Sequence, residues 1–353
     1  MRKNIDALKI AQLAGVSRAT VSRVVNSYAF VKAETRKRVL EIIEQYAYSP
    51  NFSAQILAGK KSNTIGLFHV INDPIGSRSR LEDTHVNFII ERVINTVMLA
   101  GFYVLVYQVR DTERFEEKKK ICDMFNQSRI DAGIFIGFPN TCTLIEELIA
   151  HGFIVGIFNQ HRDDKAEANR VVVRLDYSGI IEQVKYAVGL GHKDIMFIGS
   201  DMIRQSGVDI FCIFREGMKM QGLSAKEEFI LSASAFTKTH AVEVFSTFME
   251  KGSALPSCII CGNDIMALGV MEVLQEHNIR VPDDVSIIGS DDILVSRYFN
   301  PPLTTMRYDF DGMIKTLSSK VVECIDHPFT TQFVQTYSGE MVIRNSCTAA
   351  ASF

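Results

Sequence analysis

The sequence contains no apolar run that approaches the ~18 residues a membrane-spanning helix needs. Residues 1–10 also lack the apolar core of a secretion signal, because charged side chains interrupt them at Arg2, Lys3, Asp6 and Lys9. We therefore expect no membrane partner and no export, and a protein that stays in the cytoplasm.

Motifs of nucleotide-dependent and hydrolytic enzymes are also missing. No GxGxxG follows the first predicted strand, and GxxxxGKS/T, HExxH and GxSxG do not occur. The eight histidines are dispersed along the chain. An enzyme built on nucleotide chemistry is one rival hypothesis, and it has little support here. We expect no catalytic residues, no cofactor and no metal site.

The seven cysteines are an odd number and are scattered through apolar stretches, which is typical of reduced thiols. Only Cys258 and Cys261 have motif spacing. A redox pair of this kind normally opens a helix, whereas residues 257–261 are typical of a buried strand, which would place the two thiols on opposite faces. We interpret both as structural.

Charge is distributed unevenly along the chain. With 353 residues, 47% of them hydrophobic and 22% charged, the composition is that of a soluble globular protein of two or three folding units. The total charge of −3 divides into +7 for residues 1–62 and −10 for the remainder. A basic head on an acidic body indicates a polyanionic partner for the head alone.

The basic head has the pattern of a helix-turn-helix. Asp6 can cap a helix over residues 7–14, which Gly15 ends, and Ser17 can cap a second helix over residues 18–26. A third helix is predicted at about residues 33–46. It would bury its apolar positions, which are Val39, Ile42, Ile43 and Tyr46.

The second helix has a polar side that could meet base edges in a major groove. This side consists of Arg18, Ala19, Ser22, Arg23 and Asn26. Arginine suits guanine and asparagine suits adenine. The alternative is a small three-helix bundle with a solvated basic face that binds no DNA.

The head contains IAQLAGVSRATVSRVVN over residues 10–26, ETR over 34–36 and YSPN over 48–51. These three segments resemble the DNA-binding head of the lactose-repressor (LacI/GalR) family. The resemblance implies an operator of double-stranded DNA, contacted by Ser17, Arg18, Ala19, Thr20, Ser22, Arg23 and Asn26 of the head and by Asn51, Ser53, Ala54 and Leu57 of the next segment. Lys32 stands where the family commonly has a Ser cap.

That next segment, residues 49–59, has a Ser cap, a Pro at the first helical position and a final Gly, so it can form about two helical turns. So short a helix is marginal in water and should form only when docked. In the resembling family, paired hinge helices enter the minor groove, and Leu57 stands at the position of the wedging leucine. Phe52 stands where an Arg is frequent.

The remainder of the chain alternates short apolar runs with helical patterns, which predicts two doubly wound parallel sheets. The candidate strands are residues 64–70, 103–108, 133–137, 154–158, 171–175, 194–199, 229–231, 257–261, 285–289 and a stretch near 333–343. Ligands of such sheets bind at the carboxyl ends of the strands.

The body also resembles the effector-binding core of the same family. The motifs are GLGHKDI over residues 189–195, GNDIMALG over 262–269, VPDDVS over 281–286, SDD over 290–292 and NPPLTT over 300–305. The resemblance implies a periplasmic-binding-protein-like body that dimerises and binds a small-molecule effector. We expect a helix-turn-helix domain at 1–48, a hinge at 49–62 and a body at 63–353, with a first lobe of 63–160 and 292–321 and a second of 161–291 and 322–345.

In that arrangement the effector would be bound by residues that follow strands. The expected contacts are Asn159, Ser206, Asn263 and Asp291. Asn and Asp at strand ends can instead cap helices or make turns, and we prefer that interpretation for Asp264 and Asp292.

Two departures from the family pattern concern the effector. Ile210 stands where the ligand-clamping Arg is expected, and an aliphatic side chain cannot replace a guanidinium. An apparent extension over residues 73–85 could bring Arg78 or Arg80 to the ligand, although a solvated loop is the alternative. We expect an atypical effector, sugar-like or an anionic derivative. A second rival, a free solute-binding protein, is disfavoured by the basic head.

Overall fold

The computed structural model divides the chain into two compact units. The described residues are 5–25, 30–48, 61–71, 84–110, 112, 114–139, 142–159, 168–200 and 205–350. One unit comprises Met1–Ser62 and the other Asn63–Phe353, so the division falls where the sequence predicts the body to begin. Each unit has a buried apolar core of its own.

The described residues of the first unit form three helices, whose ends depend on specific side chains. They are α1 (Ala7–Ala14), α2 (Arg18–Val25) and α3 (Ala33–Gln45). The Asp6 carboxylate accepts the backbone N–H of Lys9 at 2.8 Å, and Gly15 ends α1 with a φ of 62°. The Ser17 hydroxyl accepts the N–H of Thr20 at 3.1 Å. The shared core consists of Ile10, Ala11, Ala14, Val21, Val24 and Val39.

The end of α3 differs from the expected pattern. Tyr46 was predicted to be buried, but its side chain is 41% exposed. The helix ends at Gln45, so Tyr46 no longer follows the helical repeat that carries Val39 and Ile42 inward. Lys32 makes no side-chain cap hydrogen bond, as its replacement of a Ser predicts.

The second unit begins with a six-stranded sheet in the order β11-β5-β4-β3-β1-β2, in which all paired strands are parallel. Its strands are β1 (Thr64–Val70), β2 (Tyr103–Val109), β3 (Ala132–Ile136), β4 (Ile154–Phe158), β5 (Arg170–Asp176) and β11 (Phe333–Ser338).

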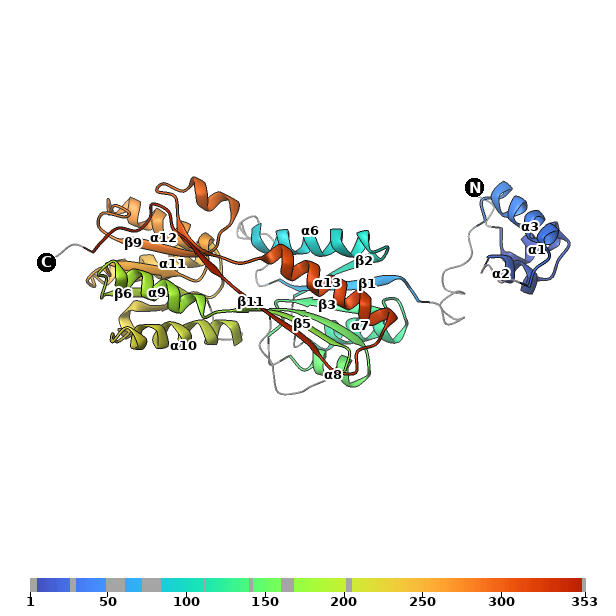
Figure 1. Cartoon of the computed structure of the whole chain (residues 1–353), viewed down its shortest axis with the longest axis horizontal. Coiled ribbons are helices and arrows are strands. Elements are labelled where there is room, and N and C mark those ends of the chain that lie inside the picture. Colours follow the sequence, from blue (N-terminus) through green and yellow to red (C-terminus); the bar gives the residue numbers. More distant parts are fainter. Residues whose placement is uncertain are drawn as a thin grey trace. The chain divides into compact units, whose positions relative to one another are not determined.

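Helices cover both faces of this first sheet. They are α6 (Thr84–Leu99), α7 (Phe115–Asn126), α8 (Leu144–Ala150) and α13 (Phe310–Asp326). Val93 of α6 and Leu317 of α13 share one core with Ile65 of β1, and the two helices lie side by side (Figure 1). Phe125 of α7 and Leu148 of α8 form the core of the opposite face.

A second six-stranded sheet has the order β12-β10-β9-β8-β6-β7, parallel except for β12. Its strands are β6 (Ile195–Gly199), β7 (Ile230–Ser232), β8 (Cys258–Cys261), β9 (Ser286–Asp291), β10 (Thr304–Arg307) and β12 (Glu340–Val342). The expectation of two doubly wound, mainly parallel sheets is therefore confirmed.

Four helices of the described part of the chain flank the second sheet, and short 3-10 turns precede β7 and β10. These elements are α9 (Gly179–Gly189), α10 (Gln205–Met220), α11 (Lys238–Glu250), α12 (Asp264–Glu276), η1 (Glu227–Phe229) and η2 (Leu294–Tyr298). Cys258 lies in the core beneath α9 and α10, and Cys261 in the core beneath α11 and α12. Both thiols are fully buried on opposite faces, as the sequence predicts for structural cysteines.

The lobe boundaries predicted from the sequence were wrong in three places. Strand β5 was assigned to the second lobe, but it pairs with β4. Strand β11 was also assigned to the second lobe, but it pairs with β5 of the first sheet. The residues of β10 were assigned to the first lobe, but β10 pairs with β9 of the second sheet. Each sheet is completed by strands distant in sequence, so the chain passes between the sheets after β5, after β10 and after β11 (Figure 1).

Candidate functional site

The exposed side of α2 presents the polar residues that the sequence predicts for DNA contact. Arg18, Ala19, Ser22 and Arg23 are exposed. On the opposite side Val21 is buried against α1 and α3. The small head thus holds an arginine-bearing surface on a short, firmly packed helix.

Ser17 and Thr20, also predicted to contact DNA, are already engaged with each other. Their hydroxyls lie 3.0 Å apart, and Ser17 Oγ accepts the Thr20 N–H. This pair fixes the start of α2 and so sets the position of Arg18. Asn26, Asn51, Ser53, Ala54 and Leu57, together with Arg78 and Arg80, lie outside the described residues.

In the body, the two asparagines predicted to bind the effector make hydrogen bonds within the protein. Asn263 caps α12, with its Oδ1 accepting the Met266 N–H at 2.8 Å and its Nδ2 donating to the Phe236 carbonyl at 3.2 Å. Asn159 has a φ of 57°, and its Nδ2 donates to the Tyr177 hydroxyl at 2.7 Å. Its Oδ1 accepts the Leu175 N–H at 3.1 Å.

Asp291 differs from both, because its carboxylate has no hydrogen-bond or ion-pair partner among the described residues. It is the last residue of β9 and has a φ of 104°, a backbone conformation that is unusual for any residue but glycine. Burial, and then the nearby charge of Asp264, raise the pKa of Asp291 well above its usual value. An unpartnered, largely desolvated carboxylate at a strand end is suited to receive a ligand.

Asp264 has a structural role, as the sequence predicts. It is fully buried and accepts the Thr305 hydroxyl at 2.5 Å and the Ile293 N–H at 2.9 Å. Burial raises the pKa of Asp264 to about 7. The two hydrogen bonds connect the start of α12 to η2 and β10.

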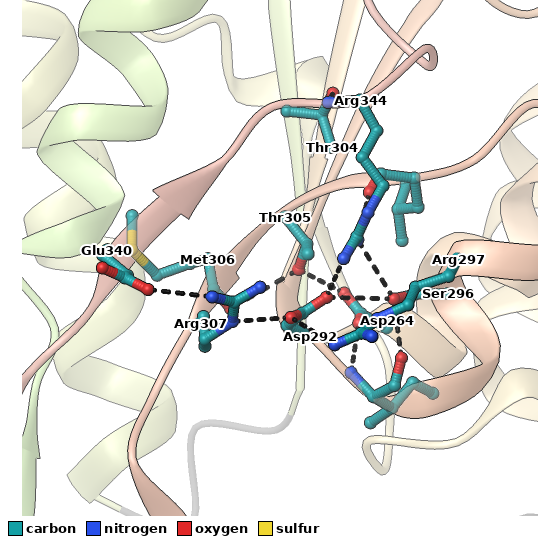
Figure 2. Close-up of polar contacts among 12 residues, drawn as sticks. Asp264, Asp292, Ser296, Arg297, Thr304, Thr305, Met306, Arg307, Glu340 and Arg344 are labelled. Carbon is teal, nitrogen blue, oxygen red and sulfur yellow. Dashed lines mark hydrogen bonds and ion pairs between the residues drawn. The ribbon is translucent and has the colours of Figure 1, made fainter.

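Asp292 is also structural, and Figure 2 shows the ion pairs around it. Its side chain is 2% exposed, with Arg344 at 2.5 Å, Arg307 at 2.7 Å and Arg297 at 3.8 Å. Burial works to raise the pKa of Asp292, but the hydrogen bonds from Arg344 and Arg307 outweigh it and hold that pKa below its usual value. Arg307 also contacts Glu340 of β12 at 3.0 Å.

The helix expected to carry the ligand clamp presents apolar side chains instead. Ile210 of α10 is 4% exposed and belongs to the core that includes Phe197 and Phe214. It packs beside Gly199, the last residue of β6. Ser206 lies on the same helix, but its side chain is outside the described part.

Sequence reasoning missed the arginines around Asp292 and the residue that follows Arg307, Tyr308. Arg307 and Arg344 carry no motif of their own, and their common partner becomes apparent only when β9, β10 and the residues after β12 are brought together. In the described part of the chain, no group of His, Cys, Asp or Glu side chains could hold a metal ion. No helix in that part is both long and apolar enough to cross a lipid bilayer.

Comparison with known proteins identifies both units. The profile of "Bacterial regulatory proteins, lacI family" matches residues 8–51, and that of "Periplasmic binding protein-like domain" matches residues 184–347. The chain is thus similar to lacI-family regulators in its head and to periplasmic binding protein-like domains in its body. It is 27% identical over 340 residues to the HTH-type transcriptional repressor PurR of Vibrio campbellii, covering 96% of this chain and 97% of PurR.

Other relatives agree with this assignment. A probable HTH-type transcriptional repressor of Bacillus subtilis, ExuR, is 28% identical over 350 residues, covering 96% of each chain. The fold matches a solved lac repressor dimer bound to operator and the anti-inducer ONPF, with a TM-score of 0.79, 23% identity and coverage of 98% and 100%. It also matches a complex of the regulator CelR with cellobiose, with a TM-score of 0.71, 21% identity and coverage of 97% and 99%.

These findings set the coarse function. The chain is a DNA-binding repressor with a periplasmic-binding-protein-like regulatory body, similar to the lacI family, and it is not an enzyme. The resemblance and fold predicted from the sequence are therefore confirmed.

Proposed function

We propose that this repressor binds a near-palindromic operator as a cytoplasmic homodimer and that a sugar or sugar derivative bound to the body changes its operator affinity. The observation that carries the proposal is the exposed arginine surface of α2, held by its own cap and core in a head of net charge +7. A body of two sheets crossed three times by the chain suits ligand-linked changes in lobe geometry.

The recognition contacts follow from the position of each side chain. Arg18 and Ala19, at the amino end of α2, would select bases, while Arg23 and Asn26 would support base and phosphate contacts. In the hinge, Asn51, Ser53 and Ala54 would contact the DNA and Leu57 would wedge between base steps of the minor groove.

Exposed apolar side chains on the body support a dimer. At the end of α6 and on the edge strand β2, Met98, Leu99, Tyr103 and Val106 are exposed, and so are Leu294 and Tyr298 of η2. Groups of large exposed apolar side chains mark interfaces. A two-fold dimer would present two α2 helices to the two half-sites of one operator.

Selection from a random-sequence DNA library with the full-length protein tests the proposal. We expect a preferred near-palindromic sequence whose binding weakens steeply with added salt. Arg18→Ala should reduce the preference for that sequence over random DNA by about 10- to 100-fold.

Arg38→Ala on α3 is the matched control. Arg38 is exposed, so its loss should weaken binding evenly across sequences and leave the preference unchanged. A protein that selects no sequence would favour the solute-binding alternative. If Arg18→Ala also lowered affinity evenly, Arg18 would be a phosphate contact.

A further inference from the structure

Residues 344–350, which follow β12, run across the amino ends of strands in the second sheet, and we call them the strap. The strap passes the amino ends of β10 and β9 and then reaches the turn between α9 and β6. Backbone hydrogen bonds fix each part of this path. They are Asn345 N–H to the Pro302 carbonyl at 3.0 Å, Ile287 N–H to the Ser346 carbonyl at 2.8 Å and Ala350 N–H to the Leu190 carbonyl at 2.8 Å.

The first part of the strap, residues 344–346, is anchored by side chains as well. Arg344 pairs with the buried Asp292. Ser346 is fully buried, and its hydroxyl donates to the Ile287 carbonyl at 2.6 Å and accepts the Thr304 N–H at 2.8 Å. These three residues therefore belong to the fixed structure of the second sheet.

The second part of the strap, residues 347–350, lies nearer the surface. Thr348 and the residue after it are exposed, and the Thr348 N–H donates to the Ser286 hydroxyl at 3.1 Å. The Cys347 thiol donates to the Ile287 carbonyl at 3.2 Å. A Cβ added to Gly191 would lie 3.6 Å from the Cβ of Ala350, so the strap packs against the turn that holds the next residue, His192.

His192 lies under this second part and is only 2% exposed. Its Nε2 lies 3.0 Å from the Thr348 carbonyl oxygen, which can only accept, so Nε2 carries a proton. Its Nδ1 lies 3.0 Å from the Ser257 hydroxyl, which can donate to it. The neutral ring therefore has a hydrogen-bond partner for both nitrogens, and one partner belongs to the strap.

A second proton on His192 would keep these hydrogen bonds but bury a charge. Nδ1–H would donate to the Ser257 hydroxyl, which would then donate to the Asp194 carbonyl 3.2 Å away. No described carboxylate pairs with the ring, and the carboxylate of Asp194 is paired with Lys226 at 2.6 Å. Burial lowers the pKa of His192, and its bond to the Thr348 carbonyl offsets part of this effect. A buried imidazolium without a counter-charge is unfavourable.

The titratable groups that flank this histidine do not change charge in the same pH range. Cys347 and Cys258 are the chain neighbours of its two partners, and Tyr186 of α9 shares their core. Burial raises the pKa of all three above its usual value. Lys193, the next residue in the chain, is exposed. Among these groups, His192 is the one that titrates in mild acid.

We propose that residues 347–350 are a detachable end of the strap and that protonation of His192 releases them from the body. Their release lets water reach the charged ring without separating paired strands, because β12 ends at Val342. Residues 344–346 stay anchored. The docked end is favoured above about pH 6.5, the ordinary pKa of histidine, and is progressively lost as the pH falls below it. This device requires neither the operator nor the effector of the proposed function.

Hydrogen exchange of the full-length protein from about pH 5.5 to about pH 8, read by mass spectrometry of its peptides, tests the proposal. The reporters are the amides of Thr348 and Ala350, which are both hydrogen-bonded in the docked strap. Wild type is compared at each pH with His192→Gln, whose side-chain amide can still donate to the Thr348 carbonyl but does not titrate. We expect at least about threefold faster exchange of the strap in wild type at the acid end, and equal exchange at the alkaline end.

His277→Gln is the matched control, because His277 is an exposed histidine at the end of α12 in the same lobe. Its strap should exchange as in wild type. Equal exchange in wild type and His192→Gln at every pH would overturn the proposal. Acid-induced exchange of β8 together with the strap would overturn it too, because the whole sheet would then be opening.

Ser286→Ala gives a second test that does not depend on the folding of His192→Gln. It keeps His192 and removes the hydroxyl that accepts the Thr348 N–H. We expect about fivefold faster exchange of the strap at every pH, with the acid dependence of wild type, because both changes act on one opening equilibrium. Strap exchange that is unchanged in Ser286→Ala, or that lacks acid dependence, would contradict the proposal.

Discussion

Replacing Asp264 by Asn should remove a pH dependence of stability that the wild-type protein shows between about pH 4 and about pH 7. In the folded protein Asp264 is fully buried and forms no ion pair with any described residue, and its two hydrogen bonds come from the Thr305 hydroxyl and the Ile293 N–H. Burial raises its pKa from the ordinary 3.8 to about 7. The folded state therefore holds this proton more tightly than the unfolded chain does.

The sign and size of the effect follow from that difference in proton affinity. As the pH rises above about 4, the unfolded chain releases the proton freely while the folded protein must ionise a buried carboxyl, so the free energy of unfolding falls. The fall ends near pH 7, where folded Asp264 is itself ionised. At about 1.4 kcal/mol for each tenfold change in proton affinity, the loss is about 4 kcal/mol.

Urea unfolding of the full-length wild type and of Asp264→Asn, across this pH range, measures the effect. The comparison of the two curves reports Asp264, because the other groups with shifted pKa values are present in both proteins. Burial raises the pKa of Asp291, which acts in the same direction as Asp264, and lowers the pKa of His192, which acts in the opposite direction. Asp284→Asn is the control, since Arg280 lowers the pKa of Asp284 and its effect lies below this window. Parallel curves for wild type and Asp264→Asn would refute the reasoning.

Two further substitutions test packing and charge. Arg344→Met should lower the free energy of unfolding by about 3 kcal/mol, because it removes one of the cations that pair with the buried Asp292. Arg280→Met, at an exposed ion pair, should change that free energy by less than about 1 kcal/mol. Equal effects of the two substitutions in urea unfolding would contradict this. Gly289→Ala should lower Tm strongly, because its Cβ would lie 2.3 Å from an oxygen of Asp264, whereas Gly189→Ala meets nothing within 4 Å and should leave Tm nearly unchanged.

Local features of the fold could be predicted well from the sequence, because they depend on neighbouring residues. The caps at Asp6 and Ser17 and the left-handed Gly15 appear as predicted. The opposed burial of Cys258 and Cys261 follows from the period of a strand. These features need no knowledge of how distant segments meet.

Features that depend on distant segments could not be predicted. Strand β10 (Thr304–Arg307) was not predicted, and β5 and β11 were placed in the wrong lobe, because their partners are set by sheet pairing rather than by local pattern. At the site, sequence could propose Asn263 and Asp291 equally. It could not decide that Asn263 caps a helix while the Asp291 carboxylate has no hydrogen-bond or ion-pair partner among the described residues.

The three passages of the chain between the sheets have a consequence for synthesis on the ribosome. Until β10 and β11 emerge, β9 and β5 are unpaired edges, so a nascent chain that already contains most of the body has finished neither sheet. Such edges are prone to aggregate and to recruit chaperones. A chain that stops before Thr304 would therefore contain neither sheet in complete form. It would leave the ribosome with the edges of β5 and β9 unpaired.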